Sequence, residues 1–124
     1  MARHNNIGAW GESIAREYLI THGYAIMENN QRIGHNEIDI IATKEDRIVF
    51  VEVKTRSTPF TDPADAIDAK KIKRLTRAAD TSLQTFNIRH EPQFDIITII
   101  GTPETSHTLT HYPDAFLAPL AGAW

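Results

Sequence analysis

The chain of 124 residues contains no cysteine and no long hydrophobic run, and each absence excludes a class of protein. Without cysteine there are no disulfides, thiolate zinc sites or cysteine nucleophiles, so any metal must be held by carboxylates, carbonyls, imidazoles or water. Such ligands favour a hard cation. No window approaches the roughly 20 apolar residues of a membrane span, and the start MARHNNIGAWGE has no apolar signal segment. We therefore expect a cytoplasmic protein that does not enter a membrane.

The sequence also lacks an overall basic charge, a glycine-rich phosphate loop and a Ser-His-Asp order. Its net charge of −3 does not indicate a nucleic-acid-binding protein as a whole. The charge is uneven, however, because residues 70–77, KKIKRLTR, include five basic residues and no acidic one. With 41% hydrophobic residues, the chain suits one compact core and is too short for two ordinary domains. We expect residues 1–124 to form a single domain.

Periodicity and breaker residues predict two helices and five strands. The first helix starts with Asn6 as its cap and ends before Gly23. The second starts with Asp62 as its cap and Pro63 in the first helical position, and it runs to about residue 86. The expected strands cover residues 24–31, 37–43, 48–56, 94–100 and 107–112. Because the second helix connects the third and fourth strands, we expect a parallel crossover, a final edge strand and an α/β fold with helices packed on a mixed sheet.

Small residues follow one side of the first helix. Gly8, Gly11 and Ala15 lie beside its apolar stripe, so we expect this helix to approach a neighbouring element closely. Glu12 lies at the margin of that side. Since Glu12 is also four residues before Arg16, an ion pair within the helix is an alternative role for it.

Acidic residues interrupt the apolar hairpin EIDIIATKEDRIVFVEVKTR, residues 37–56. Directly opposed residues of an antiparallel pair share one face of the sheet. With a polar tip at residues 44–47, the register opposes Thr43 with Ile48, Ile41 with Phe50, Asp39 with Glu52, and Glu37 with Lys54. The alternate valines fill the other face. Two carboxylates and an ammonium group are therefore expected together on one side of the sheet.

Two opposed carboxylates repel each other, and burial increases the cost unless a proton or a cation lies between them. Mg²⁺ or Mn²⁺ would remove that cost, and such ions are commonly held by one or two carboxylates together with water and a substrate phosphate. Lys54 could orient water or neutralise charge on the phosphate, so the pattern favours phosphodiester hydrolysis. The alternative is a solvated Glu52 and Lys54 pair, with Asp39 as an edge charge that discourages aggregation.

Asp39 followed by Glu52-x-Lys54 resembles the PD-(D/E)xK nuclease signature. A longer series resembles the YraN-like family of small bacterial proteins: GESIAREYL, ENNQRIGHNEIDIIA, VFVEVKTR, AIDAKKIKRL and QFDIITI. This resemblance covers residues 8–117. It implies a restriction endonuclease-like fold in the order αβββαββ, with a mixed five-stranded sheet flanked by helices. The family's core is similar to that of Holliday-junction resolvases.

The resemblance also implies roles for individual residues. Asp39 and Glu52 become metal ligands, Lys54 becomes the catalytic lysine, and Glu12 becomes an additional acidic member of the metal and catalytic site. The backbone carbonyl of Val53 becomes a further ligand of Mg²⁺ or Mn²⁺. The sequence departs from the family pattern at two positions, since Asn36 and Gln93 stand where the family commonly has glycine and arginine. These departures affect a local turn and one possible cationic contact, and they remove no predicted metal ligand.

The basic residues of the second helix have two interpretations. They could contact nucleic-acid phosphates, because non-specific binding of nucleic acids is largely electrostatic, or they could form a solvated helix face. The residues concerned are Lys70, Lys73, Arg74 and Arg77, together with Arg56 on the third strand.

The leading hypothesis from the sequence is a metal-dependent endonuclease acting on DNA, with branched or flapped DNA as a candidate substrate. The alternative is a nucleic-acid-binding module of the same fold with little or no intrinsic cleavage, which acts with a partner. A third interpretation is an interaction protein whose acidic residues are incidental. A homodimer would suit a junction-cutting role.

Overall fold

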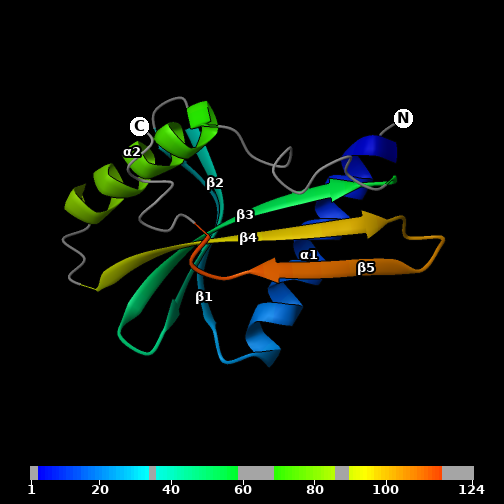
Figure 1. The fold of residues 1–124 in the computed structure, drawn as a ribbon, viewed down its shortest axis with the longest axis horizontal. Coiled ribbons are helices and arrows are strands. Elements are labelled where there is room, and N and C mark those ends of the chain that lie inside the picture. The colour runs from blue at the N-terminus through cyan, green and yellow to red at the C-terminus, as the bar shows by residue number, and fades with distance from the viewer. Residues whose placement is uncertain (1–2, 34–35, 59–68, 86–89, 116–124) are drawn as a thin grey trace.

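The computed structural model describes residues 3–33, 36–58, 69–85 and 90–115 (Figure 1). The elements are α1 (Arg3–Thr21), β1 (Ala25–Ile33), β2 (Asn36–Lys44), β3 (Arg47–Arg56), α2 (Ala69–Thr85), β4 (Glu91–Gly101) and β5 (His107–Tyr112). This order confirms the predicted αβββαββ arrangement. Neither described helix combines the length and the apolar character that are needed to cross a bilayer.

The five strands form one mixed sheet in the order β1-β2-β3-β4-β5. Strands β3 and β4 are parallel, and α2 lies in the connection between them, whereas the other neighbouring pairs are antiparallel. The predicted crossover and the predicted edge strand β5 are therefore confirmed. The second edge of the sheet is β1.

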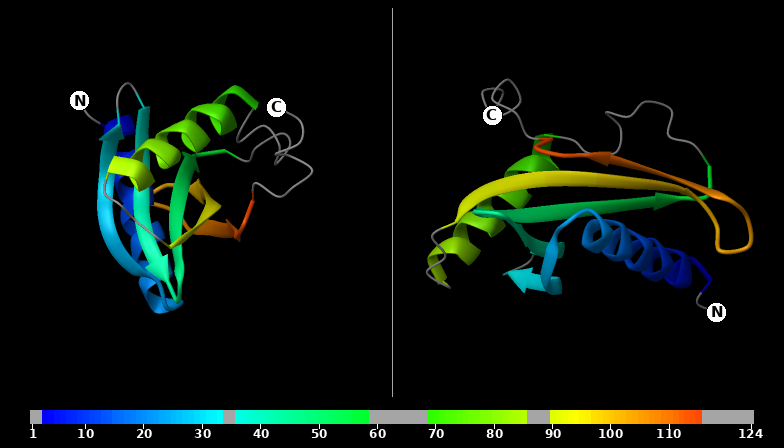
Figure 2. Two further views of the ribbon diagram at one scale, coloured as in Figure 1. Left: turned by 90° about the vertical axis from the view of Figure 1, so that its left-hand side faces the viewer. Right: turned by 90° about the horizontal axis from the view of Figure 1, so that it is seen from below.

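The helices cover opposite faces of the sheet, so the protein has two apolar layers (Figure 2). Successive side chains of a strand point to opposite faces, which supplies both layers from the same strands. The α1 side buries Ala15, Leu19, Tyr24, Ile40, Ala42, Val49, Val51, Val53, Ile97 and Ile99. The α2 side buries Ile38, Ile41, Ile48, Phe50, Ala78 and Ala79. The valines of β3 thus fill the face opposite Phe50, as predicted.

Two predicted boundaries differ from those in the structure, and a third cannot be compared. Helix α1 begins at Arg3, so the prediction of Asn6 as its cap is wrong. No proline or glycine precedes Asn6, and asparagine costs a helix interior only a few tenths of a kcal/mol, so the helix continues for a further turn. Strand β4 begins at Glu91 rather than at residue 94, because its first residues pair with the start of β3. The predicted cap of the second helix lies outside the described residues.

Helix α1 approaches β3 closely at Gly11. A methyl group at Gly11 would collide with the side chain of Thr55, near the end of β3. Ala15, one turn later, is fully buried. The predicted close approach is therefore confirmed for these two residues, whereas a methyl group at Gly8 would meet nothing within 4 Å.

A buried carboxylate organises the α1 side of β4. Asp95 is 1% exposed, and it accepts hydrogen bonds from the hydroxyl of Tyr24 (3.1 Å), Nε2 of His111 (2.7 Å), the amide of Gln93 (2.8 Å) and the N–H of Asp114 (3.0 Å). Burial alone would raise the pKa of Asp95, but the hydrogen bonds from His111, Asp114 and Gln93 outweigh it and hold the pKa below its usual range. Asp95 therefore ties β4 to β5 and to the segment before β1.

Gly11→Ala should destabilise the protein by about 1–3 kcal/mol, because overpacking against Thr55 exceeds the helix propensity that alanine gains. Gly8→Ala is the matched control on the same helix, and it should be neutral or slightly stabilising. Urea unfolding measures both effects. The double variant Gly11→Ala with Thr55→Ala should recover part of the loss, and strictly additive losses would contradict the described contact.

Asp95→Asn should cost about 2–4 kcal/mol, because it breaks a buried and fully bonded network. The pKa of Asp95 is lowered in the folded state, so the carboxylate contributes its full stability above the unfolded pKa of about 3.9. That stability is lost as the pH falls through the lower pKa of the folded state. In urea unfolding, the difference between wild type and variant should be constant near neutral pH and shrink below about pH 4. Asp46→Asn, in an exposed turn, is the control; an equal effect there would contradict this role.

Candidate functional site

The ladder between β2 and β3 stops where the acidic residues begin. It runs in the predicted register from Lys44↔Arg47 to Ile40↔Val51 and extends no further. The predicted ladder pairs of Asp39 with Glu52 and of Glu37 with Lys54 are therefore wrong as backbone pairs.

The Asp39 carboxylate explains where the ladder stops, because its Oδ2 accepts a hydrogen bond of 2.9 Å from the N–H of Val53. A side chain thus takes the place that a backbone carbonyl of β2 would have in a longer ladder. The facing of β2 changes at the same point: Ile40 packs on the α1 side, whereas Ile38, two residues away, packs on the α2 side. A rotation of the strand at Asp39 separates the two.

The side chains of Asp39 and Glu52 nevertheless come together. Glu52 is 5% exposed and follows Phe50 on the same side of β3 by strand alternation. Burial, and then the negative charge of Glu52, raise the pKa of Asp39 to about 7, although the N–H of Val53 opposes the change; a hydrogen bond between the two carboxyl groups acts in the same direction as burial. Near neutral pH the Asp39 carboxyl group therefore retains its proton for a substantial part of the time.

Glu12 brings a third carboxyl group from α1. Its pKa is raised by burial first and then by the charges of Glu37 and Glu52, while a hydrogen bond from Asn30 and the charge of Arg16 lower it. Glu12 also contributes to the raised pKa of Asp39. The two predicted roles of Glu12 are thus compatible, because Glu12 interacts electrostatically with Arg16 and also with the carboxylates of the sheet. We call Glu12, Asp39 and Glu52 the acidic cluster.

Lys54 lies beside the buried Glu52, with its Nζ 3.9 Å from Oε2 of that residue. Its side chain is 34% exposed, whereas that of Glu52 is 6% exposed. The ammonium group is therefore at the rim of the acidic cluster, where solvent or a substrate can reach it. Val53 stands between these two residues, and its backbone takes part in the site through the N–H bonded to Asp39.

The donor chemistry of this cluster fits a hard divalent cation. Carboxylate oxygens are the ligands that Mg²⁺ and Mn²⁺ prefer, and a cation between Asp39 and Glu52 would replace the proton that their repulsion now retains. Within the described ranges, no group of three or more acidic or histidine side chains is placed so that it could hold a metal ion. Two carboxylates would leave positions for a carbonyl, water and a substrate oxygen.

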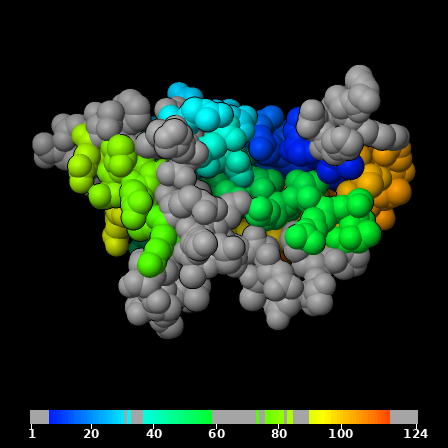
Figure 3. All heavy atoms as spheres, turned by 90° about the horizontal axis from the view of Figure 1, so that it is seen from above, coloured from blue at the N-terminus to red at the C-terminus, as the bar shows by residue number. Residues whose placement is uncertain are grey.

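The predicted phosphate-contacting residues lie on two elements. Lys73 and Arg77 are exposed on α2, and Arg56 is exposed at the end of β3. The side chains of Lys70 and Arg74 lie outside the described part of the chain. In Figure 3 the surfaces of α1 (blue), β2 (cyan) and the end of β3 (green) meet on one face, on which α2 (yellow-green) is also exposed.

Sequence reasoning missed Asn30. This residue of β1 has a left-handed backbone with φ of 53°, and its side chain hydrogen bonds to Glu12. Asparagine tolerates this conformation better than most residues with a Cβ, so the pair Asn29-Asn30 inside a predicted strand was the available signal.

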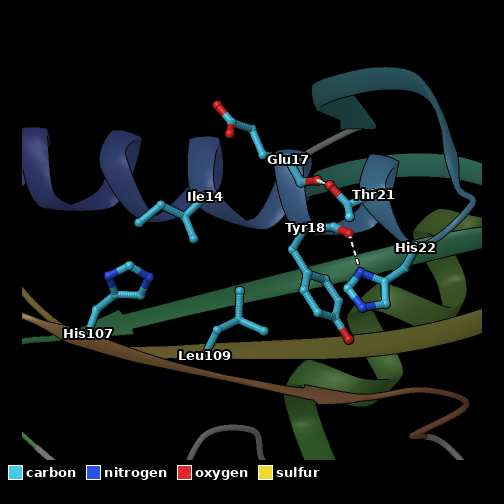
Figure 4. Close-up of a pocket in the computed structure, with 7 residues that line it drawn as sticks. All are labelled: Ile14, Glu17, Tyr18, Thr21, His22, His107 and Leu109. Atoms are coloured by element: carbon cyan, nitrogen blue, oxygen red, sulfur yellow. Dashed lines mark hydrogen bonds between the residues drawn. The ribbon is translucent and has the colours of Figure 1, made fainter.

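A groove of about 460 Å³ lies elsewhere, between α1 and β5 (Figure 4). Its lining residues are Ile14, Glu17, Tyr18, Thr21, His22, His107 and Leu109. None of these is a predicted site residue. The two histidines of β5 have separate partners: the His107 ring packs against Trp10, and His111 bonds to Asp95 and Tyr18.

Comparison with solved structures gives a distant similarity. A structure described as "The structure of Pyrococcus Furiosus SfsA in complex with Ca2+" aligns with a TM-score of 0.37 and 11% identity, over 88% of this chain and 63% of that chain. At this level the similarity carries no conclusion about the site.

Comparison of sequences gives much closer relatives. A UPF0102 protein of Parabacteroides distasonis is 50% identical over 96% of this chain and 98% of its own, and one of Bacteroides thetaiotaomicron is 49% identical over 97% and 99%. A UPF0102 protein of Caldanaerobacter subterraneus is 40% identical over 89% and 93%. Residues 11–99, which include the acidic cluster, match the family described as "Uncharacterised protein family UPF0102". The resemblance found in the sequence is thereby confirmed, and the chain belongs to the UPF0102 family.

Proposed function

We propose that this protein is a metal-dependent endonuclease that hydrolyses phosphodiester bonds in DNA, with branched DNA as a candidate substrate. The observation that carries the proposal is the meeting of Asp39 and Glu52 at the end of the β2–β3 ladder, with the pKa of Asp39 raised to about 7. A protein maintains such repulsion at a cost to its stability, and perturbed carboxylates of this kind are concentrated at functional sites. The resemblance to the PD-(D/E)xK signature supports the same assignment.

Asp39 and Glu52, with the carbonyl of Val53, are the residues that would hold Mg²⁺ or Mn²⁺, and Glu12 is the additional acidic member. When bound, such an ion lowers the pKa of water and stabilises negative charge on a phosphate. The N–H of Val53 fixes the orientation of Asp39 through their hydrogen bond. Asn30 does the same for Glu12.

Lys54 supplies a positive charge beside Glu52. Its ammonium group is close to Glu52 and is partly exposed, so it can approach a phosphate at the rim of the cluster. There it would orient the attacking water or stabilise charge that develops on the phosphate oxygens. This role needs the ammonium group and not merely a long side chain.

The net charge of the chain is −3, so the chain as a whole does not attract DNA. Attraction would have to come from a local group of basic residues. Lys73 and Arg77 on α2 and Arg56 at the end of β3 are exposed. Since α2 and the end of β3 share one face of the molecule, a duplex could contact both (Figure 3). These cations would act equally well in a binding module with little or no intrinsic cleavage, which is the second candidate function.

Asp39→Asn should stabilise the metal-free protein at pH 8 by about 1–3 kcal/mol. The folded-state pKa of about 7 exceeds the ordinary value of 3.8, so the wild type loses stability as pH rises between these values, and the neutral amide avoids this loss. Thermal unfolding across this pH range measures the effect, with Asp46→Asn as the control. Added Mn²⁺ should raise the melting temperature of the wild type and leave that of Asp39→Asn unchanged. Destabilisation by Asp39→Asn at pH 8 would contradict the described repulsion.

Cleavage of labelled linear, flapped and four-way DNA in the presence of Mg²⁺ or Mn²⁺ tests the proposed activity. Asp39→Asn, Glu52→Gln and Lys54→Met should each reduce the cleavage rate by roughly 100-fold or more, because each removes a metal ligand or a charge at the reacting phosphate. Glu45→Gln, in the exposed β2–β3 turn, should keep the wild-type rate. Circular dichroism checks that each variant folds.

Two outcomes would contradict the enzyme assignment. Cleavage that persists in both Asp39→Asn and Glu52→Gln would point to a contaminating nuclease. Salt-sensitive DNA binding without cleavage under either metal would favour the binding module instead. A crystal soaked in Mn²⁺ adds a direct measurement, since the proposal expects anomalous density between the two carboxylates.

A further inference from the structure

The two edges of the sheet differ in how they are protected against pairing with another strand. Edge strand β1 has a register shift between Ile26 and Glu28, a left-handed residue at Asn30, and exposed charges at Glu28 and Arg32. Bulges, kinks and charges of this kind are the usual means by which proteins prevent edge-to-edge association. The β1 edge is therefore closed to a regular partner strand.

Edge strand β5 has none of these features. Its sequence HTLTHY contains no lysine, arginine, aspartate, glutamate or proline, and all six residues pair with β4 in an uninterrupted register. Four of the six residues are exposed: His107, Thr108, Thr110 and Tyr112. Among the described strands, none pairs with the outer side of β5. As far as the described residues extend, this edge can accept a regular antiparallel strand.

The sequence of β5 indicates which strand would fit. The segment HTLTH, residues 107–111, reads the same in both directions around Leu109. An antiparallel pair related by a two-fold axis requires a surface that is complementary to itself. We propose that β5 pairs with β5 of a second copy of this chain, with the two-fold axis at Leu109, to form a homodimer.

This register opposes residues whose numbers add up to 218. Leu109 meets Leu109 of the second copy, Thr108 meets Thr110, and His107 meets His111. Opposed threonines and opposed aliphatic residues stabilise antiparallel pairs, and no acidic or lysine charge meets its like within the strand. The flanking acids Glu104 and Asp114 lie in the turns and limit the pairing to β5 itself.

The groove between α1 and β5 lies beside this edge (Figure 4). His107 and Leu109 belong to its lining, and β5 is the last strand on that side of the sheet. A second copy of β5 would therefore continue the sheet below the groove and bury more of Leu109. Each groove would then be built from two chains.

The dimer should be weak. Pairing of residues 107–111 between two copies buries less than the roughly 1,200 Å² that is typical of stable complexes, so we expect a dissociation constant in the micromolar range or above. The proposal does not depend on the nuclease assignment, because every measurement below is made without nucleic acid or metal.

Single cysteines in this naturally cysteine-free chain test the register. Under mild oxidation, Leu109→Cys should form a covalent dimer at least about tenfold faster than Met27→Cys, a control with an exposed side chain on the β1 edge. A mixture of Thr108→Cys and Thr110→Cys should crosslink faster than either variant alone, because these positions oppose each other only between copies. The mixture also keeps the test decisive if Leu109→Cys does not fold.

Sedimentation equilibrium tests the association without a crosslink. The wild type should dimerise at high protein concentration, whereas the double variant Thr108→Lys and Thr110→Lys should remain monomeric, because it opposes lysines across the axis. Mixing this lysine variant with a second double variant, which carries both Thr108→Glu and Thr110→Glu, should restore a dimer. A wild type that stays monomeric, or crosslinking of Met27→Cys as fast as that of Leu109→Cys, would overturn the proposal.

Discussion

The hydrogen bond from the N–H of Val53 to the Asp39 carboxylate is the constraint on which the arrangement of the site depends. It ends the β2–β3 ladder after Ile40↔Val51 and holds one carboxylate at the point where the strands part. A longer ladder would have given Val53 a backbone partner and left Asp39 as one more strand residue. Because the strands part here, Glu12 of α1 can come within electrostatic reach of Asp39 and Glu52. The close approach at Gly11 lets the helix come near enough.

Two aspartates of the same sheet, the buried Asp95 and the half-buried Asp39, show opposite electrostatics. Asp95 has four hydrogen-bond donors and a lowered pKa, so its charge is fully compensated. Asp39 has the N–H of Val53 and a neighbouring carboxyl group, and its pKa is raised. A purely structural site would resemble that of Asp95. The uncompensated charge at Asp39 marks the place where the chain gives up stability, as proteins commonly do at functional sites.

Local sequence determined most of the fold and part of the site. The order of elements, the hairpin register up to Ile40 and the side of the sheet that each β3 residue faces all follow from period-two patterning and a short polar turn. The rotation at Asp39 could not be predicted, because it results from a side chain that competes with the backbone for the N–H of Val53. The partners of Asp95 were equally hidden, since Tyr24 and His111 are distant in sequence and meet only after the sheet forms. Propensity rules also place a helix start poorly when no breaker residue precedes it.

Helix α1 contributes side chains both to the acidic cluster and to the contacts of β5. Glu12 on one side of the helix reaches the acidic cluster, whereas Tyr18 on another side hydrogen bonds to His111 of β5 at 3.0 Å and lines the groove beside the β5 edge. The helix packs closely on β3 at Gly11, where even a methyl group would collide with Thr55. A partner strand at the β5 edge would therefore lie beside the same helix that carries Glu12. The acidic cluster and the sheet edge are thus connected through a single packed helix, although their residues come from opposite ends of the sequence.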